Sequence, residues 1–198
     1  MSETMKRSFQ VTVAVLLCSA GLSSAASAGD LYDLDPDHTQ TVFHIDHLGY
    51  STVTGSFRQL KGVLTLDEAH PEQSLVEATI EASSVDTGIP SRDEDLRSSE
   101  FFDIARHQTL TFRTTKVKRR GPRSADLSGE LTLLGISKPV TLRTTFNRIA
   151  PDPLRNNRVV AGFTATTTIR RSDFGMKAFI PLIGDVVRID INAEAIRR

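Results

Sequence analysis

The sequence predicts an all-β fold, an antiparallel sheet that closes into a barrel. The first observation behind this prediction is that apolar and polar residues alternate with a period of two, as in residues 76–82 and 187–193. The second is that turn-forming residues, such as Gly121-Pro122 and Pro151-Asp152-Pro153, separate these runs. Each strand then has one apolar and one solvated face, which is typical of antiparallel sheets.

About nine strands or strand fragments are expected, each bounded by turn residues or by loss of the alternation. In chain order they lie at 41–46, 51–57, 60–66, 76–82, 109–117, 127–133, 140–146, 158–169 and 187–193. Another turn is expected over residues 135–139. One short helix is expected over residues 91–102, because Asp93, Glu94 and Asp95 in its first turn suit the helix dipole.

Small residues on the apolar faces favour a barrel over a stacked sandwich. These positions are Gly62, Ala78, Ala82, Gly129, Thr144, and Gly162 or Ala165. A solid sandwich core needs larger side chains to reach packed density, whereas an eight-stranded barrel has room for one slender ligand. Alternatively, the small residues only let the strands coil sharply. The pattern leaves both interpretations open.

Residues 1–28 have the features of a secretory signal peptide. A short basic region precedes an apolar stretch too short to span a membrane, and Ala26-Ser27-Ala28 offers a cleavage site. We therefore expect a single domain over 29–198 that is periplasmic or secreted after cleavage before Gly29. Cleavage also removes Cys18, the only cysteine, so neither a disulfide nor a thiolate metal site is expected.

The composition disfavours several functional classes. The chain has 24 basic and 24 acidic residues, and a protein that grips nucleic acid usually carries a basic excess. It has no Gly-x-Ser-x-Gly elbow and no glycine-rich phosphate loop. His44 and His47 lie three residues apart on an expected strand, so they point to opposite faces and do not form a simple metal site. We expect neither catalysis nor a bound metal.

Basic residues cluster around the expected Gly121-Pro122 turn: Lys116, Lys118, Arg119, Arg120 and Arg123. Such a hairpin tip could make transient contact with a membrane surface through anionic headgroups, at about 1 kcal/mol per charge. The alternative is a solvated turn whose charges discourage pairing with other strand edges.

Eight short segments carry a family resemblance. They are YDLDPDHT (32–39), VFHIDHLG (42–49), VTGSF (53–57), ASSVDT (82–87), RDEDLRSSEFFD (92–103), GELTLLGISKPV (129–140), IRRSDFG (169–175) and IGDVV (183–187). Together, and in this order, they resemble the YceI-like family of polyisoprenoid-binding, lipocalin-like exported proteins. Thr39 stands where the family often has Ser, and the chain lacks the tryptophan signature of the lipocalins themselves.

The resemblance implies an eight-stranded antiparallel lipocalin-like barrel, capped by the short helix and enclosing a long apolar pore. It implies no cofactor other than a bound isoprenoid lipid, such as a polyprenyl chain or a prenylquinone, and family members can form a homodimer. A strand of ten residues spans about 33 Å, and each buried methylene contributes about 0.8 kcal/mol. Apolar contact alone could therefore hold a long tail.

Within this fold we expect the pore to be lined by the inward apolar side chains Phe43, Ile45, Leu64, Val76, Ala78, Ile80, Phe112, Leu131, Leu142, Phe163, Ile189 and Ile191. The expected gates at its ends are Phe101, Phe102 and Phe174. The candidates for polar contact with a headgroup are His38, His44, His47 and Arg171. Arg171 has an alternative role, local pairing that pins a loop.

The sequence thus predicts a non-enzymatic, exported binding protein that stores or transports an isoprenoid lipid or prenylquinone. Two alternatives stay open. One is a stress-protective or interaction protein whose barrel holds no lipid. The other is an enzyme that acts on a prenyl or quinone substrate through histidines near the end of the pore.

Overall fold

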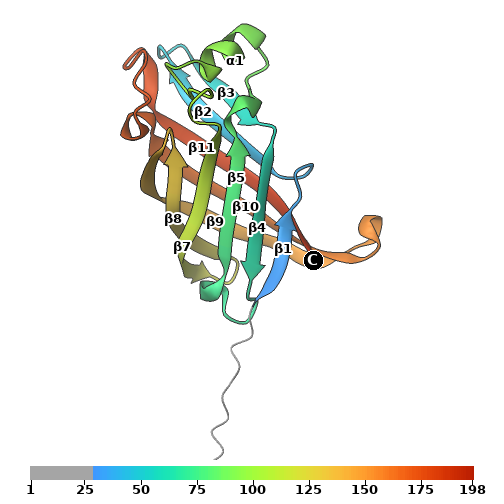
Figure 1. The fold of residues 1–198 in the computed structure, drawn as a ribbon. Helices are drawn as coiled ribbons and strands as arrows, with labels where there is room; N and C mark the ends of the chain where they lie inside the picture. The colour runs from blue at the N-terminus through green and yellow to red at the C-terminus, as the bar shows by residue number, and fades with distance from the viewer. Residues whose placement is uncertain (1–28) are drawn as a thin grey trace, which may run out of the picture.

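The computed structural model describes residues 29–198, and the expected signal peptide, residues 1–28, lies outside the described residues. The chain forms one antiparallel sheet in the order β1-β4-β5-β7-β8-β9-β10-β11-β2-β3-β6, with an additional pairing of β1 with β11 (Figure 1). The strands are β1 (Asp30–Leu34), β2 (Gln40–His47), β3 (Ser51–Phe57), β4 (Leu60–Leu66), β5 (Leu75–Glu81), β6 (Val85–Asp86), β7 (Thr109–Gly121), β8 (Ser124–Leu133), β9 (Ile136–Asp152), β10 (Arg158–Arg170) and β11 (Ile183–Arg197). The helical elements are α1 (Pro90–Arg97) and the 3-10 turns η1 (Pro71–Gln73), η2 (Ala82–Ser84), η3 (Pro153–Arg155) and η4 (Arg171–Phe174).

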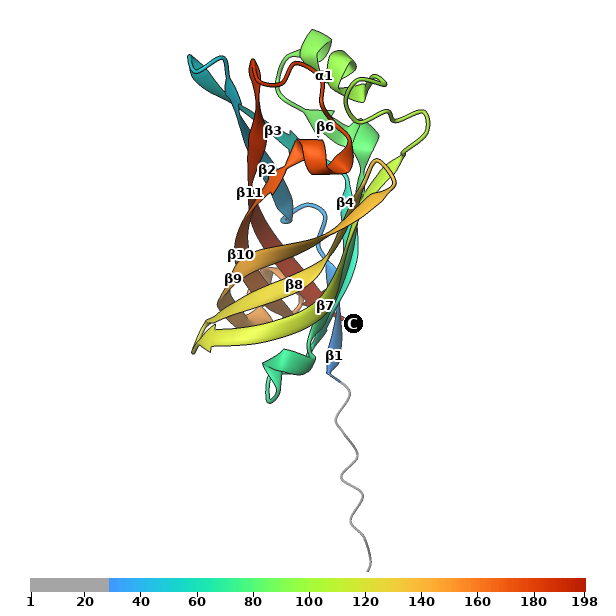
Figure 2. The same ribbon diagram turned by 90° about the vertical axis from the view of Figure 1, so that its left-hand side faces the viewer.

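The sheet is a closed eight-stranded barrel, if strands that follow one another across a short break are counted as one barrel strand, and this confirms the expected fold (Figure 2). β1 and β2 form one interrupted barrel strand, because β11 pairs with β2 from Ile183 to Asn192 and with β1 from Ala195 to Arg197. β3 and β4 form a second, broken at residues 58–59. The other six barrel strands are β5 with its continuation β6, and β7, β8, β9, β10 and β11.

The two ends of the barrel differ. We call the end that carries α1, the β2–β3 turn, the β8–β9 turn and the β10–β11 connection the helix end (Figures 1 and 2). The opposite end carries η1, the β7–β8 hairpin and η3, and we call it the hairpin end. Within residues 29–198, no helix is long and apolar enough to cross a membrane.

The helix is shorter than expected. α1 ends at Arg97, and Ser98 leaves the helix with an extended backbone while its N–H still donates to the Asp95 carbonyl. Phe101 and Phe102 therefore lie in turns that fold back, and the Phe102 N–H donates to the carbonyl of Leu96 at 2.9 Å. The turn expected over residues 135–139 is confined to Leu134-Gly135, and β9 runs from Ile136 to Asp152, so it also includes the first two residues of the turn expected at Pro151-Asp152-Pro153. The short strands β1 and β6 were not predicted.

The small inward residues divide into two groups. A Cβ on Gly129 would overlap the ring of Phe112 and the backbone of β7, and one on Gly62 would overlap the backbone of β5. These glycines therefore allow close approach of neighbouring strands. Ala78, Thr144 and Ala165 face the interior instead and leave space there.

Two separate clusters of buried side chains hold the barrel. At the helix end, Phe57, Phe102, Phe174 and their neighbours pack together, with the Phe57 and Phe102 rings edge to face at 5.4 Å between centroids. The second cluster is built on Tyr32, which is fully buried against Leu64, Ala161 and Ala195. The space between the clusters is not filled by these side chains.

The break between β1 and β2 is fixed by a buried carboxylate. Asp35 accepts hydrogen bonds from the Asp37 N–H (3.1 Å) and from His38 Nδ1 (2.7 Å). Arg155 of η3 forms an ion pair with the same carboxylate, and its Nη2 lies 2.5 Å from Asp35. Burial alone would raise the pKa of Asp35, but the hydrogen bonds from Arg155 and His38 outweigh it and hold the pKa below its ordinary value.

The low pKa of Asp35 predicts acid sensitivity. A carboxyl group whose pKa is depressed in the folded state stabilises the protein above its unfolded-state pKa of about 3.9, and this stability is lost as the pH falls further. We expect Asp35→Asn to lower the free energy of unfolding at pH 7 by about 1.5–3 kcal/mol. Urea unfolding should show that the deficit shrinks towards pH 3, with the exposed Asp37→Asn as control; an equal deficit at both pH values would contradict the assignment.

Candidate functional site

A continuous cavity of about 810 Å³ occupies the interior of the barrel. This volume lies in the range of roughly 300–1,000 Å³ found for small-molecule sites. The cavity reaches both ends, because its wall includes Ser91 and Phe179 at the helix end and Pro71 and Pro122 at the hairpin end. Since successive side chains of a strand point alternately inward and outward, one face of every barrel strand contributes to this wall.

The middle of the wall is almost entirely apolar. Of the expected pore residues, those that lie on the wall are Phe43, Ile45, Leu64, Val76, Ala78, Ile80, Phe101, Phe102, Phe112, Leu131, Leu142, Phe163, Ile189 and Ile191. Threonines, such as Thr144 and Thr167, supply the polar atoms between them. Charged side chains lie only toward the two ends, so the middle can bind a ligand by dispersion and apolar burial alone.

Phe174 does not lie on the cavity wall. It is 1% exposed and packs inside the helix-end cluster, where η4 turns its side chain. The aromatic residue at this position of the mouth is Phe179, which sequence reasoning missed. Phe179 lines the cavity, is 53% exposed and stacks on Phe101, with 6.1 Å between the ring centroids and 19° between the planes. It lies in an irregular segment, where no alternation indicates the direction of a side chain.

The three expected headgroup histidines are not brought together. Only His47 lies on the cavity wall, at the helix end of β2. His44 points to the outer face, with Nδ1 3.1 Å from Thr54 Oγ1 and Nε2 3.0 Å from Asp190. His38 lies outside the cavity beside Asp35 and Arg155. The opposite orientations of His44 and His47 follow from their spacing on a strand.

Arg171 is buried on the cavity wall at the helix end, with 2% of its surface exposed. Its guanidinium donates to four backbone carbonyls, those of Gly184 (2.8 Å), Met176 (3.3 Å), Ala178 (2.8 Å) and Ile183 (3.0 Å). Burial lowers the pKa of Arg171, and the charge of Asp185 opposes this shift. The side chain thereby fixes the connection between β10 and β11, and its donors are directed at this connection.

The ends of the cavity carry mixed charges. At the helix end the charged wall residues include Arg92, Asp95 and Glu100, and at the hairpin end they include Asp67, Glu68, Arg119 and Arg123. Opposite charges at each end can orient a polar headgroup without selecting strongly for either sign.

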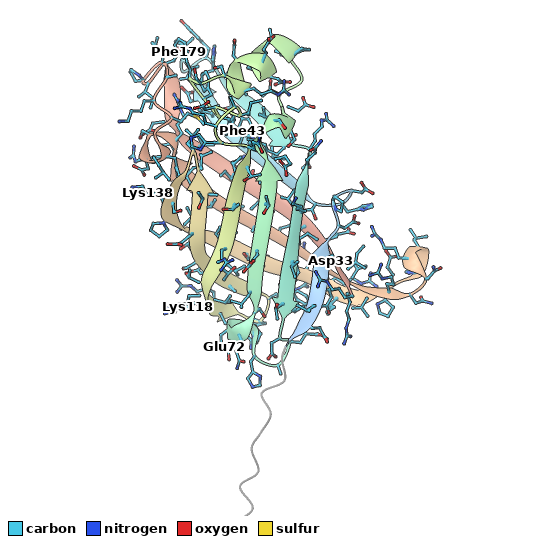
Figure 3. All side chains as sticks on the ribbon, viewed as in Figure 1. Asp33, Phe43, Glu72, Lys118, Lys138 and Phe179 are labelled. Carbon is cyan, nitrogen blue, oxygen red and sulfur yellow. The ribbon has the colours of Figure 1, made fainter. Side chains whose placement is uncertain are left out.

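The basic cluster of the β7–β8 hairpin is partly committed to local partners. Arg120 forms an ion pair with Asp126. Arg123 donates to the carbonyls of Phe146 (2.9 Å) and Asn147. Lys116 and Lys118 are exposed on β7, and Figure 3 shows Lys118 toward the hairpin end. These contacts fit a solvated turn, and a transient membrane contact of this hairpin stays a prediction.

Among residues 29–198, one group of side chains has the spacing of metal ligands: Asp35, His38 and Glu194. Arg155 lies within this group, with Nη2 2.5 Å from Asp35, 2.8 Å from His38 Nδ1 and 3.7 Å from Glu194. The guanidinium supplies the positive charge that a cation would bring, so the group is explained as an ion-pair network.

The whole barrel matches proteins of known sequence. The YceI-like domain model matches residues 32–195. A UPF0312 protein of Ectopseudomonas mendocina is 37% identical over 186 residues, which cover 93% of this chain and 96% of that protein. A UPF0312 protein of Pseudomonas aeruginosa is 38% identical over 191 residues, covering 94% and 98%.

Solved structures share the fold. The YceI protein of Campylobacter jejuni is 28% identical, with a TM-score of 0.69 over 77% of this chain and 90% of that one. Burkholderia cenocepacia BcnA is 19% identical, with a TM-score of 0.74 over 81% and 98%. A polyisoprenoid binding domain from Saccharophagus degradans is also 19% identical, with a TM-score of 0.65 over 84% and 98%. The family model spans nearly all of the described barrel, and the chain therefore belongs to the YceI-like family.

Proposed function

We propose that this protein is an exported, non-enzymatic binding protein that holds the tail of an isoprenoid lipid or prenylquinone inside its barrel, for storage or transport. The observation that carries the proposal is the apolar cavity of about 810 Å³, with charged groups confined to its ends. A long tail fits such a wall, because binding strength then grows with the buried length and needs no polar contact. The structural neighbour from Saccharophagus degradans is described as polyisoprenoid binding, which supports the ligand class.

The geometry favours this proposal over both alternatives. A barrel filled by its own side chains would leave no interior volume of this size. An enzyme of the expected kind would need histidines near the end of the pore as acid or base. Of these, only His47 lies on the cavity wall, whereas His38 and His44 are held by partners outside the cavity. Export to the periplasm or beyond is proposed from the signal-like pattern of residues 1–28. A homodimer stays a prediction.

Solvent extraction of the gently purified native protein, followed by mass spectrometry, tests the proposal directly. We expect about one isoprenoid lipid or prenylquinone per chain, because water should not replace a ligand that buries this much apolar surface. A protein that yields no lipid, and that also takes up no prenylquinone in a detergent titration, would contradict the proposal.

Two neighbouring threonines provide a matched pair for blocking the cavity. Thr167 lies on the cavity wall in β10, and Thr166 is exposed on the outer face of the same strand. We expect Thr167→Phe to reduce bound lipid severalfold, since the ring occupies ligand space, with a stability change below about 1–3 kcal/mol because the cavity gives the ring room. Thr166→Phe should keep the lipid content of the parent protein. Equal lipid content in two folded variants would count against binding inside the barrel.

The apolar wall also predicts how affinity depends on tail length. Each additional buried methylene should improve the dissociation constant about fourfold, since about 0.8 kcal/mol is gained per group. A titration with prenylquinones of increasing length should therefore show rising affinity until the tail fills the cavity, and then a plateau. An affinity that is independent of tail length would place the binding determinants at the headgroup instead.

A further inference from the structure

Exposed apolar side chains gather at one side of the helix end. Leu48 and Tyr50 come from the β2–β3 turn, and Tyr50 is 89% exposed. The others come from the connection between β10 and β11 and the start of β11. We call this set the apolar rim, and its members are Leu48, Tyr50, Phe179, Ile180, Leu182 and Val186. Figure 3 shows Phe179 at this end of the barrel.

The two segments of the rim are held together by backbone contacts. The Leu48 N–H donates to the Leu182 carbonyl at 2.8 Å, and His47 pairs with Ile183 across the sheet. Arg171 fixes the second segment through the four carbonyls described above. The rim is therefore presented by an ordered backbone, which reduces the entropy lost when it binds a partner.

The rim continues into the cavity. Phe179 belongs to both, because its ring is half exposed and also lines the cavity wall beside Phe101. Its neighbour Ile183 and the rim-adjacent His47 lie on the same wall. Arg171 also lies on the wall beside this path, but its guanidinium donates to backbone carbonyls of the same connection. An apolar path thus leads from the surface of the protein past this arginine to the interior.

The charged groups beside the rim are largely satisfied by their own neighbours. Asp46 accepts from the Gly49 N–H at 3.0 Å, and Asp185 accepts from the N–H and hydroxyl of Ser172 at 2.9 Å. Arg170 forms an ion pair with Asp185 at 3.4 Å, while Lys177 and Asp173 are exposed and of opposite sign. The helix α1, which carries Asp93, Glu94 and Asp95, lies on the other side of the helix end from the β10–β11 connection (Figure 1). A partner of this surface is therefore apolar and not selected by charge.

We propose that the apolar rim docks on the surface of a lipid bilayer, so that cargo passes between bilayer and cavity at the helix end. This inference rests on the proposed lipid-binding function. A tail that is insoluble in water resides in a bilayer, and a rim continuous with the cavity lets the tail move without crossing water. A second copy of the chain fits this surface less well, since six side chains fall short of the 20–30 residues per partner typical of stable interfaces.

The test compares apolar residues at opposite ends. Leu48→Asp and Leu182→Asp alter the rim, and neither residue lies on the cavity wall. Leu154→Asp is the matched control, because Leu154 is 93% exposed in η3 at the hairpin end. Flotation with phosphatidylcholine vesicles at about 0.1 M and about 0.5 M salt should show binding of the parent and control proteins at both concentrations, because neutral apolar contact is little screened. Each rim substitution should lower the partition coefficient about tenfold or more.

Three results would overturn the docking inference. The first is equal flotation of the rim variants and the control. The second is binding that requires anionic lipid and disappears at high salt, which would favour the basic hairpin. The third is a dimer in solution that the rim substitutions convert to a monomer, which would make the rim a contact between two copies.

Cargo uptake from detergent solution separates this inference from the proposed function. The rim variants should take up a prenylquinone from detergent as the parent protein does, because their cavity is unchanged, and only transfer from vesicles should slow. A parent protein that floats with vesicles but takes up no prenylquinone from detergent would refute the lipid-binding function while leaving the docking surface intact.

Discussion

Closure of the sheet through β11 is the constraint on which the remaining structure depends. One edge of β11 pairs with β10 along eleven residue pairs, and the other edge pairs first with β2 and then with β1. A single strand thus joins the first and last parts of the chain and leaves no open edge at the seam. Because the sheet is closed, the inward side chains of all eight barrel strands face one another across the interior, and the width of this interior is set by the number of strands.

Stability and binding are concentrated in different parts of this barrel, although Phe102 and Leu64 belong both to the packed clusters and to the cavity wall. An unfilled apolar space costs stability, by roughly 24 cal/mol per Å³ in cores emptied by substitution. The barrel offsets this cost at its ends, where the aromatic cluster around Phe57 and Phe102 and the cluster around Tyr32 are well packed. Residues 29–198 contain no cysteine, so packing and the strand ladders hold the structure without a disulfide. The middle is therefore free to accept a ligand.

The alternation of apolar and polar residues predicted the regular strands, because only there do side chains repeat with a period of two. β3 and β4 begin and end where the sequence indicated, and the side chains on the apolar faces of β2, β5 and β11 line the cavity. Period two fixes the face of a side chain but not its partner strand. It also could not show that Gly62 and Gly129 serve close strand approach, because that depends on which backbone lies opposite.

The prediction of the aromatic residue at the mouth was wrong in the connection between β10 and β11, and the physical reason also explains how the helix end is built. Phe174 ends η4 and packs in the core, whereas Phe179 lies five residues later in a segment without regular structure and stands at the mouth. Phe179 has a φ of 59°, which is uncommon for a bulky residue. Arg171 donates to carbonyls on both sides of Phe179, and these hydrogen bonds hold the segment in this backbone conformation. Burial removes the hydration of the guanidinium, and the carbonyls replace the hydrogen bonds lost to water. A charge pattern in the sequence suggests ion pairs between side chains, so it gives no signal for an arginine whose partners are backbone carbonyls. The position of the aromatic ring at the mouth therefore depends on a tertiary contact, and it could be found only once the fold had brought the carbonyls around that arginine.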